Sequence, residues 1–93
     1  MDFKVRISDA ALTDFEEILA YSWANFPETA ERFGNALLNH TELLAKFPMI
    51  GAPVEGRPGI RQLVHTPILI YYRVDEVRGL VEILHFWHGS RRR

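Results

Sequence analysis

The chain has 93 residues, a formal net charge of −1, 47% hydrophobic residues and no cysteine. This length fits a single domain over residues 1–93, and the hydrophobic content argues against an intrinsically disordered chain. The absence of cysteine excludes disulfides and thiolate zinc sites, and it fits a cytoplasmic protein. The sequence shows no signal peptide and no apolar run of the ~20 residues that a membrane helix needs.

Charge is distributed unevenly along the chain. Residues 1–56 hold four cations and nine acids, a net charge of −5, whereas residues 57–93 hold seven arginines and three acids, a net charge of +4. This asymmetry predicts two surfaces with different partners. The alternative is that the acids only solvate helix faces and that three terminal arginines inflate the positive count.

The first half of the chain predicts a strand and two helices. Residues 3–7 alternate apolar and basic side chains, which is typical of a half-buried strand, and Ser8 or the next residue can cap a helix. Pro27 separates the two predicted helices by a short connection, which favours an antiparallel hairpin, and Pro48 ends the second. Helical spacing predicts that the first helix buries Leu12, Phe15, Ile18, Leu19, Ser22, Trp23 and Phe26. The second is predicted to bury Ala30, Phe33, Leu37, Leu44 and Phe47.

The second half predicts a loop followed by three strands. Met49–Gly59 holds three glycines and two prolines, as a loop does. Ile60–His65, Ile68–Val74 and Leu80–Trp87 favour an antiparallel meander, and the nearly continuous apolar run of the last predicts a central strand covered on both faces. The predicted fold class is therefore α+β: an N-terminal strand, an antiparallel helical hairpin and a three-stranded antiparallel meander, with the helices on one face of a four-stranded sheet.

No metal or cofactor site is predicted. His85 and His88 lie an odd number of residues apart, so they point to opposite faces of their strand. His40 and His65 belong to no recognisable motif. The chain also lacks an HExxH sequence, a glycine-rich phosphate loop before a helix and a serine-hydrolase signature.

The remaining chemistry rests on cations, one histidine and one tyrosine. Metal-free cleavage of a phosphodiester needs a group that takes the 2′-hydroxyl proton, a group that protonates the leaving oxygen, and cations that stabilise the charge on phosphorus. Histidine suits the proton transfers, and the arginine fork binds two phosphate oxygens. If the protein is a nuclease, the candidate catalytic residues are Arg61, His88 and Arg91. The candidate phosphate- or target-binding residues are Arg61, Tyr72, Arg73 and Arg91.

Each candidate also has a structural interpretation. Arg61 could serve only to form an ion pair with Glu82 or another acid. His88 ends a strand beside a glycine, where a histidine is often a structural group. Tyr72 is of a residue type that commonly packs inside a sheet.

Five segments spread over almost the whole chain carry a resemblance to a known family. They read "VRISDAALTDFEEILAY", "LLAKFPMIG", "GIRQLVH", "ILIYYRV" and "VEILHFWHGSR". In this order and at these lengths they resemble the RelE/ParE superfamily of toxins from type II toxin–antitoxin systems. The resemblance implies a small bacterial toxin, associated with plasmid stabilisation, that a cognate antitoxin neutralises by wrapping it with an extended or helical segment.

The resemblance also implies roles for particular residues. RelE-like members cleave mRNA in the ribosomal A site without a metal, and ParE-like members inhibit DNA gyrase. Arg61 lies where RelE-like nucleases have a mid-sheet arginine that contacts phosphate, and Arg91 lies near their C-terminal arginine. His88 lies at an end-of-strand position where some nuclease members keep a histidine, although similar endings occur among ParE-like sequences.

The chain departs from the RelE-like nucleases in three respects. It has only two lysines, its sequence pI is about 6.4, and no tyrosine follows Trp87. A strongly basic chain with a lysine run is what binding to the ribosome favours. We therefore expect a ParE-like inhibitor of DNA gyrase. The alternatives are a RelE-like endonuclease that needs the ribosome and mRNA, and a non-toxic relative that only binds an antitoxin.

Overall fold

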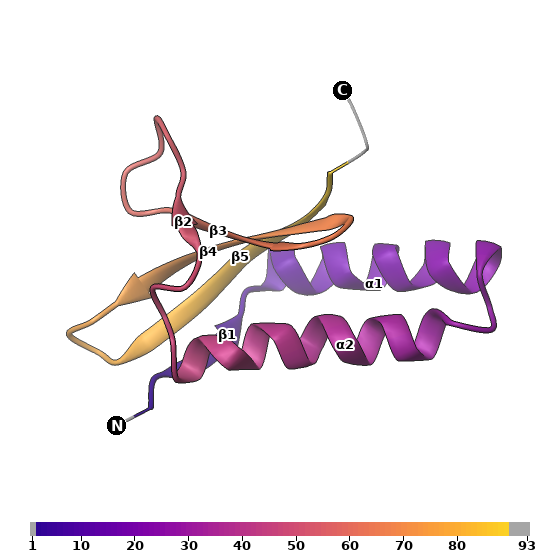
Figure 1. Ribbon diagram of the computed structural model, residues 1–93, viewed down its shortest axis with the longest axis horizontal. Coiled ribbons are helices and arrows are strands. Elements are labelled where there is room, and N and C mark those ends of the chain that lie inside the picture. The colour runs from indigo at the N-terminus through magenta and orange to yellow at the C-terminus, as the bar shows by residue number, and fades with distance from the viewer. Residues whose placement is uncertain (1, 90–93) are drawn as a thin grey trace.

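The computed structural model describes residues 2–89 of the chain. Figure 1 shows a sheet beside two long helices. The elements in chain order are β1 (Lys4–Ile7), α1 (Asp9–Asn25), α2 (Ala30–Glu42), the short 3-10 helix η1 (Leu43–Ala45), β2 (Ala52–Pro53), β3 (Arg61–His65), β4 (Ile68–Asp75) and β5 (Leu80–His88).

The strands form one mixed sheet in the order β1-β5-β4-β3-β2. Strands β3, β4 and β5 form the predicted antiparallel meander, and β5 lies between β1 and β4, as expected of a central strand. Strand β1 runs parallel to β5, with Ile7 opposite Ile83. The sheet has five strands rather than the four expected, because Ala52–Pro53 pairs with β3 inside the predicted loop. So short a strand has no readable periodicity, and its proline is tolerated because β2 lies at the edge.

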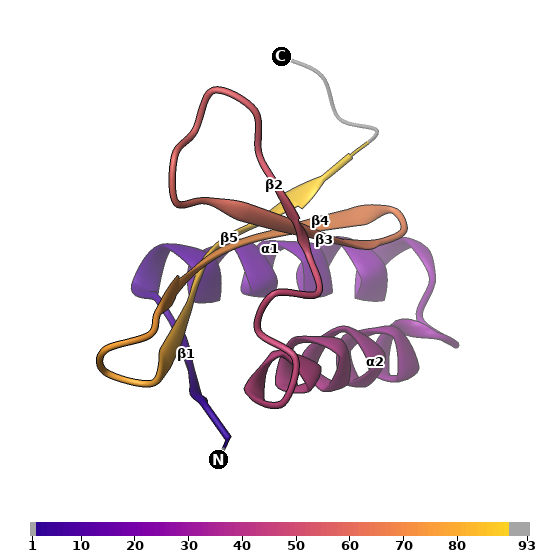
Figure 2. The same ribbon diagram turned by 60° about the vertical axis from the view of Figure 1, so that its left-hand side comes forward.

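Both helices share one core with the sheet. Ser8, one of the two capping candidates, accepts a hydrogen bond from the Ala11 N–H at 3.1 Å and caps α1. Figures 1 and 2 show α1 and α2 running antiparallel on the same side of the central strands. The core consists of Ala11, Phe15, Ile18, Leu37, Leu44, Leu63, Ile68, Ile70, Tyr72, Val81, Ile83 and Phe86.

The set of helix side chains predicted to be buried is only partly correct. Leu12, Trp23 and Phe26 were expected inside, but they are 47%, 51% and 58% exposed, and Phe47 is 55% exposed. Helix α1 instead buries Ala11, Phe15, Ile18 and Ser22. Two of these side chains are small, so the helix can approach the sheet closely on that stripe, and this leaves several larger apolar groups on the surface.

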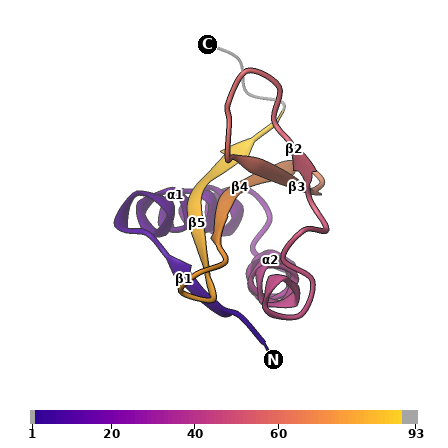
Figure 3. The ribbon, with the colours of Figure 1, turned by 90° about the vertical axis from the view of Figure 1, so that its left-hand side faces the viewer.

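Strand β5 is covered by helices on one face, not on both as expected. Its apolar run is explained by a bulge, because Tyr71 lies opposite His85 while Tyr72 lies opposite Ile83, which leaves Leu84 as the extra residue. The bulge lets Ile83 and Phe86 both face the core although their separation is odd. Figure 3 shows the connection between β2 and β3 standing away from α2.

Gly51 joins the helical half of the molecule to the sheet at a point where the chain has no spare room. A Cβ atom at Gly51 would lie 2.7 Å from both the Gln62 carbonyl oxygen and the Tyr72 hydroxyl. A Cβ atom at Gly34 would also come within 2.7 Å of an atom, but that atom is the end of the flexible Leu19 side chain. The two glycines therefore differ in how well their surroundings can adjust.

We predict that Gly51→Ala lowers the free energy of unfolding by about 2–4 kcal/mol, because backbone and a buried hydroxyl must move. Gly34→Ala should lower it by less than about 1 kcal/mol, since Leu19 can shift and alanine favours the helix. Urea unfolding followed by circular dichroism measures both variants. Equal losses would contradict the assignment of Gly51 as the tighter position.

Candidate functional site

Arg61 directs its guanidinium to the chain segment before β2. Its Nη1 donates to the Gly51 carbonyl at 2.6 Å and to the Met49 carbonyl at 3.3 Å. The alternative that Arg61 pairs with Glu82 is wrong, because that carboxylate binds two other arginines. The structural role of Arg61 is therefore to hold the connection between the helical hairpin and the sheet.

Tyr72 holds the same connection from the core. The side chain is fully buried, and its hydroxyl donates to the Pro48 carbonyl at 2.8 Å and accepts from the Gly51 N–H at 2.9 Å. Burial raises the pKa of Tyr72, against the smaller lowering effects of the Gly51 N–H and the Arg61 charge. The hydroxyl thus stays protonated and engaged inside the molecule, with no exposed surface for an RNA or protein target.

Arg73 lies on the other face of the sheet. Glu82 forms ion pairs with two arginines. Its Oε1 lies 2.9 Å from Arg73 Nη2, and its Oε2 lies 2.9 Å from Arg6 Nη2. The hydrogen bond from Arg73, followed by that from Arg6, lowers the pKa of Glu82 despite its burial. The two arginine side chains remain 61% and 64% exposed, so this cluster could still meet an anionic group.

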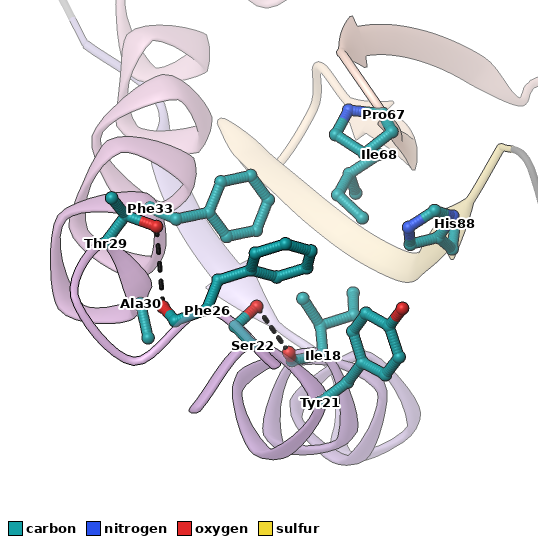
Figure 4. A pocket seen from close by; sticks show the side chains of 10 residues that line it. All are labelled: Ile18, Tyr21, Ser22, Phe26, Thr29, Ala30, Phe33, Pro67, Ile68 and His88. Atoms are coloured by element: carbon teal, nitrogen blue, oxygen red, sulfur yellow. Dashed lines mark hydrogen bonds between the residues drawn. The ribbon is translucent and has the colours of Figure 1, made fainter. Parts of the chain in front are cut away.

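His88 borders a pocket at the turn of the helical hairpin, which Figure 4 shows from close by. The pocket has a volume of about 190 Å³, and the Tyr21 ring meets the His88 ring edge-on with centroids 6.5 Å apart. In Figure 4 the rings of Phe26 and Phe33 come from the helix side and Pro67 and Ile68 from the strand side. We call this the hairpin pocket; it is lined by Ile18, Tyr21, Ser22, Phe26, Thr29, Ala30, Phe33, Pro67, Ile68 and His88.

The sequence candidates do not meet at one point. Arg61 lies opposite Tyr72 and His88 lies opposite Ile68, so the two are offset by four positions along β4. That spacing is about 13 Å along the strand, which is too far for both side chains to hold one phosphate group through their strand positions alone. Arg91 lies outside the described residues.

A carboxylate–histidine pair, which the sequence analysis missed, links α1 to β5. Asp14 Oδ2 lies 2.9 Å from His85 Nδ1 and accepts the Phe86 N–H at 3.1 Å. The Phe86 N–H is open to α1 because the pairing of β1 with β5 ends at Ile83. A carboxylate on Nδ1 fixes the orientation of an imidazole, as in sites of proton transfer. The two residues are 71 positions apart, so no local motif could reveal them.

His85 also borders an open groove on the face of the sheet away from the helices. Loop residues form one side of it and strand residues of β4 and β5 the other. We call it the sheet-face groove; it is lined by Val54, Glu55, Arg57, Ile60, Tyr71, Leu84, His85 and Trp87. Tyrosine, tryptophan and arginine are the types that most often dominate the energy of protein interfaces.

His40 and His65 form a second pair that the sequence did not reveal. Their Nδ1 atoms are 2.8 Å apart, so one ring must donate and the other accept, and Phe33 packs edge-on against His65. Burial, followed by the effect of His40, lowers the pKa of His65. The pair connects α2 to the end of β3, and its surroundings favour the neutral form of His65.

Within residues 2–89, no three histidine, aspartate or glutamate side chains lie together as a metal site would require. None of the helices in this range is both long enough and apolar enough to span a membrane.

We predict that Arg61→Ala lowers the free energy of unfolding by about 1–3 kcal/mol, because its charged hydrogen bonds to the Met49 and Gly51 carbonyls, the second of them partly buried, are lost. Arg73→Ala is the matched control on a neighbouring strand. It should change stability by less than about 1 kcal/mol, since its ion pair is exposed. Urea unfolding at neutral pH measures both, and a larger loss for Arg73→Ala would refute this ranking.

The lowered pKa of His65 predicts a pH effect with a definite sign. The folded protein binds a proton at His65 less readily than the unfolded chain does, so stability should be greatest above about pH 6.5 and fall as the pH drops through the lower folded value. His65→Gln and His40→Gln should each flatten the stability profile between pH 8 and pH 5. Urea unfolding at several pH values measures it, and an unchanged slope in both variants would exclude the pair as its cause.

The chain matches the family described as the ParE toxin of the type II toxin–antitoxin system parDE over residues 5–93. No curated protein sequence matches it. A chromosomal ParDE system from P. aeruginosa is similar in structure, with a TM-score of 0.81 and 20% identity over 95% of this chain and 97% of that chain.

Two RelE-type structures are also similar. The RelBE2 toxin–antitoxin complex of Mycobacterium tuberculosis gives a TM-score of 0.74 and 22% identity, over 95% of this chain and 99% of that chain. A mutant of the E. coli toxin RelE in the free state gives 0.71 and 13%, over 97% and 86%. At these identities the likeness establishes a common fold. Together with the match over residues 5–93, it shows that the chain belongs to the ParE toxin family of type II toxin–antitoxin systems, within the RelE/ParE superfamily.

Proposed function

We propose that this toxin arrests growth by ParE-like inhibition of DNA gyrase and that its cognate antitoxin relieves the arrest. The observation that carries the proposal is the ParE family match over residues 5–93. The chain's low lysine content and pI of about 6.4 also favour a protein target over the ribosome.

The positions of the candidate cations support the same choice. A metal-free nuclease needs its proton-transfer groups and its cations around one phosphate. Arg61 is engaged with backbone carbonyls, Tyr72 is buried, and Arg73 is on the face of the sheet that carries Glu82. The described members of the set predicted from sequence are thus spread over the molecule rather than gathered around one anion.

The sheet-face groove is the surface we propose for the protein target. Tyr71 and Trp87 provide aromatic area, and Arg57 provides a fork of donors at the loop side. Asp14 holds His85 at the groove margin through the 2.9 Å contact. Aromatic side chains beside an arginine are of the types that most often dominate the binding energy of protein interfaces.

A RelE-like, metal-independent endoribonuclease is the second candidate, and the Asp14–His85 pair is the observation that favours it. With Asp14 on Nδ1, His85 could take a proton through Nε2, while Tyr71 and Trp87 could stack on bases. This arrangement uses residues other than Arg61, His88 and Arg91, which remain the nuclease candidates predicted from sequence.

The gyrase proposal predicts that purified toxin inhibits DNA supercoiling and that added antitoxin restores it. Trp87→Ala and Arg57→Ala should each raise the toxin concentration for half inhibition by about 10-fold or more, because interface anchors are lost. Trp23→Ala is the matched control, since this exposed tryptophan lies on α1 outside the groove. No inhibition of gyrase at any toxin excess would rule the proposal out.

A ribosome assay separates the second candidate. Codon-phased mRNA cleavage that disappears in His85→Ala would establish a nuclease that uses His85. Cleavage lost only in Arg61→Ala or His88→Ala would instead support the catalytic residues predicted from sequence. Normal growth after expression of folded toxin without antitoxin would instead identify a non-toxic relative.

A further inference from the structure

A narrow cleft runs between α1 and the last part of β5. It exists because the pairing of β1 with β5 ends at Ile83, so the following β5 residues face α1 instead of a strand. We call it the α1–β5 cleft; it is lined by Asp14, Glu17, Ile18, Phe86, Trp87 and His88. Ile18 and His88 also line the hairpin pocket, so the cleft and the pocket adjoin at these two residues, and we call the two together the path.

The pocket at the end of this path suits an apolar group. Its volume of about 190 Å³ is large enough for one aromatic or large aliphatic side chain. Two of its few polar groups are already used, because Ser22 donates to the Ile18 carbonyl and Thr29 to the Phe26 carbonyl. Tyr21 and Phe26 are about half exposed at its walls, so apolar surface is available for a partner.

The surroundings of the path are acidic. Residues 14–31, which include most of its helical lining, contain five acids and no lysine or arginine. Glu17 lines the cleft, and Glu28 and Glu31 stand next in sequence to the pocket residues Thr29 and Ala30. These three glutamates form no ion pair within residues 2–89, whereas Asp14 already binds His85 and the Phe86 N–H. Among the described residues this margin is acidic, and an acidic margin favours a basic partner.

The length of the path defines the kind of segment that fits it. From Asp14 to Phe26 helix α1 and its cap advance by twelve residues, about 18 Å. An extended chain of five or six residues covers that distance. A peptide segment of this length can therefore reach from the cleft to the pocket.

We infer that the antitoxin neutralises this toxin with a short basic segment that lies along the α1–β5 cleft and inserts one bulky apolar side chain into the hairpin pocket. The inference rests on the antitoxin part of the proposed function and is independent of gyrase. It specifies the chemistry of the antitoxin segment: at least one lysine or arginine near Glu17, and a large apolar residue near the hairpin turn.

The test uses the full toxin and the protein encoded by the short open reading frame beside its gene. Isothermal titration calorimetry gives the Kd for two variant pairs that are matched in residue type. Glu17→Lys changes the cleft, and Glu16→Lys changes the adjacent exposed position on the same helix. Phe26→Ala changes the pocket, and Trp23→Ala removes a similarly exposed aromatic outside it. Circular dichroism confirms that each variant is folded.

We expect Glu17→Lys to raise the Kd by about 5–20-fold at 50 mM salt and by much less at 500 mM salt, because the contact is electrostatic. Phe26→Ala should raise it by about 10-fold or more at both salt concentrations, because the lost contact is apolar. Glu16→Lys and Trp23→Ala should each change it by less than about 3-fold. An antitoxin variant with its facing basic residue changed to glutamate should restore binding to Glu17→Lys toxin.

Two results would overturn the inference. Equal effects within each matched pair would mean that the antitoxin binds elsewhere, and a partner that does not bind the folded toxin at all would remove its basis. The supercoiling assay does not enter this readout. A toxin without effect on gyrase but with the expected pattern of Kd values would therefore leave the inference intact and refute only the choice of target.

Discussion

The buried Tyr72 hydroxyl is the contact on which the arrangement of this toxin depends. It binds the Pro48 carbonyl on one side and the Gly51 N–H on the other, and Arg61 adds a donor to the Gly51 carbonyl. These bonds secure the segment that joins the helical hairpin to the meander. An unmade hydrogen bond at so buried a hydroxyl is expensive, so the segment has one favourable path. Its small residue, Gly51, follows from the same crowding.

This constraint also limits which side chains are left for partners. Because Arg61 and Tyr72 are used inside the molecule, the side chains left for partners lie elsewhere. Polar and aromatic groups line the sheet-face groove, whereas acidic residues surround the hairpin pocket and the α1–β5 cleft. The two surfaces differ in composition but adjoin, because Trp87 lines both the sheet-face groove and the α1–β5 cleft. Each surface can still offer a partner its own chemistry.

The regular parts of the fold could be predicted from local patterns. Strand alternation, the Ser8 cap and the Pro27 break depend on neighbouring residues, and each has its expected place in the structure. The edge strand β2 and the bulge at Leu84 could not be predicted, because each depends on which strand lies alongside. The exposure of Trp23 could not be predicted for a related reason. The way α1 packs against the sheet decides which of its apolar side chains are buried.

The sequence alone determined the α+β class, the order of the elements and the family resemblance, because these follow from periodicity, turn residues and short motifs. It also supplied the candidate residues, but not their partners. Only the tertiary structure decided that Glu82 binds Arg6 and Arg73, and that Asp14 binds His85 across 71 positions. Such contacts arise where strand register and helix packing bring distant residues together, and no local pattern in the chain records that geometry.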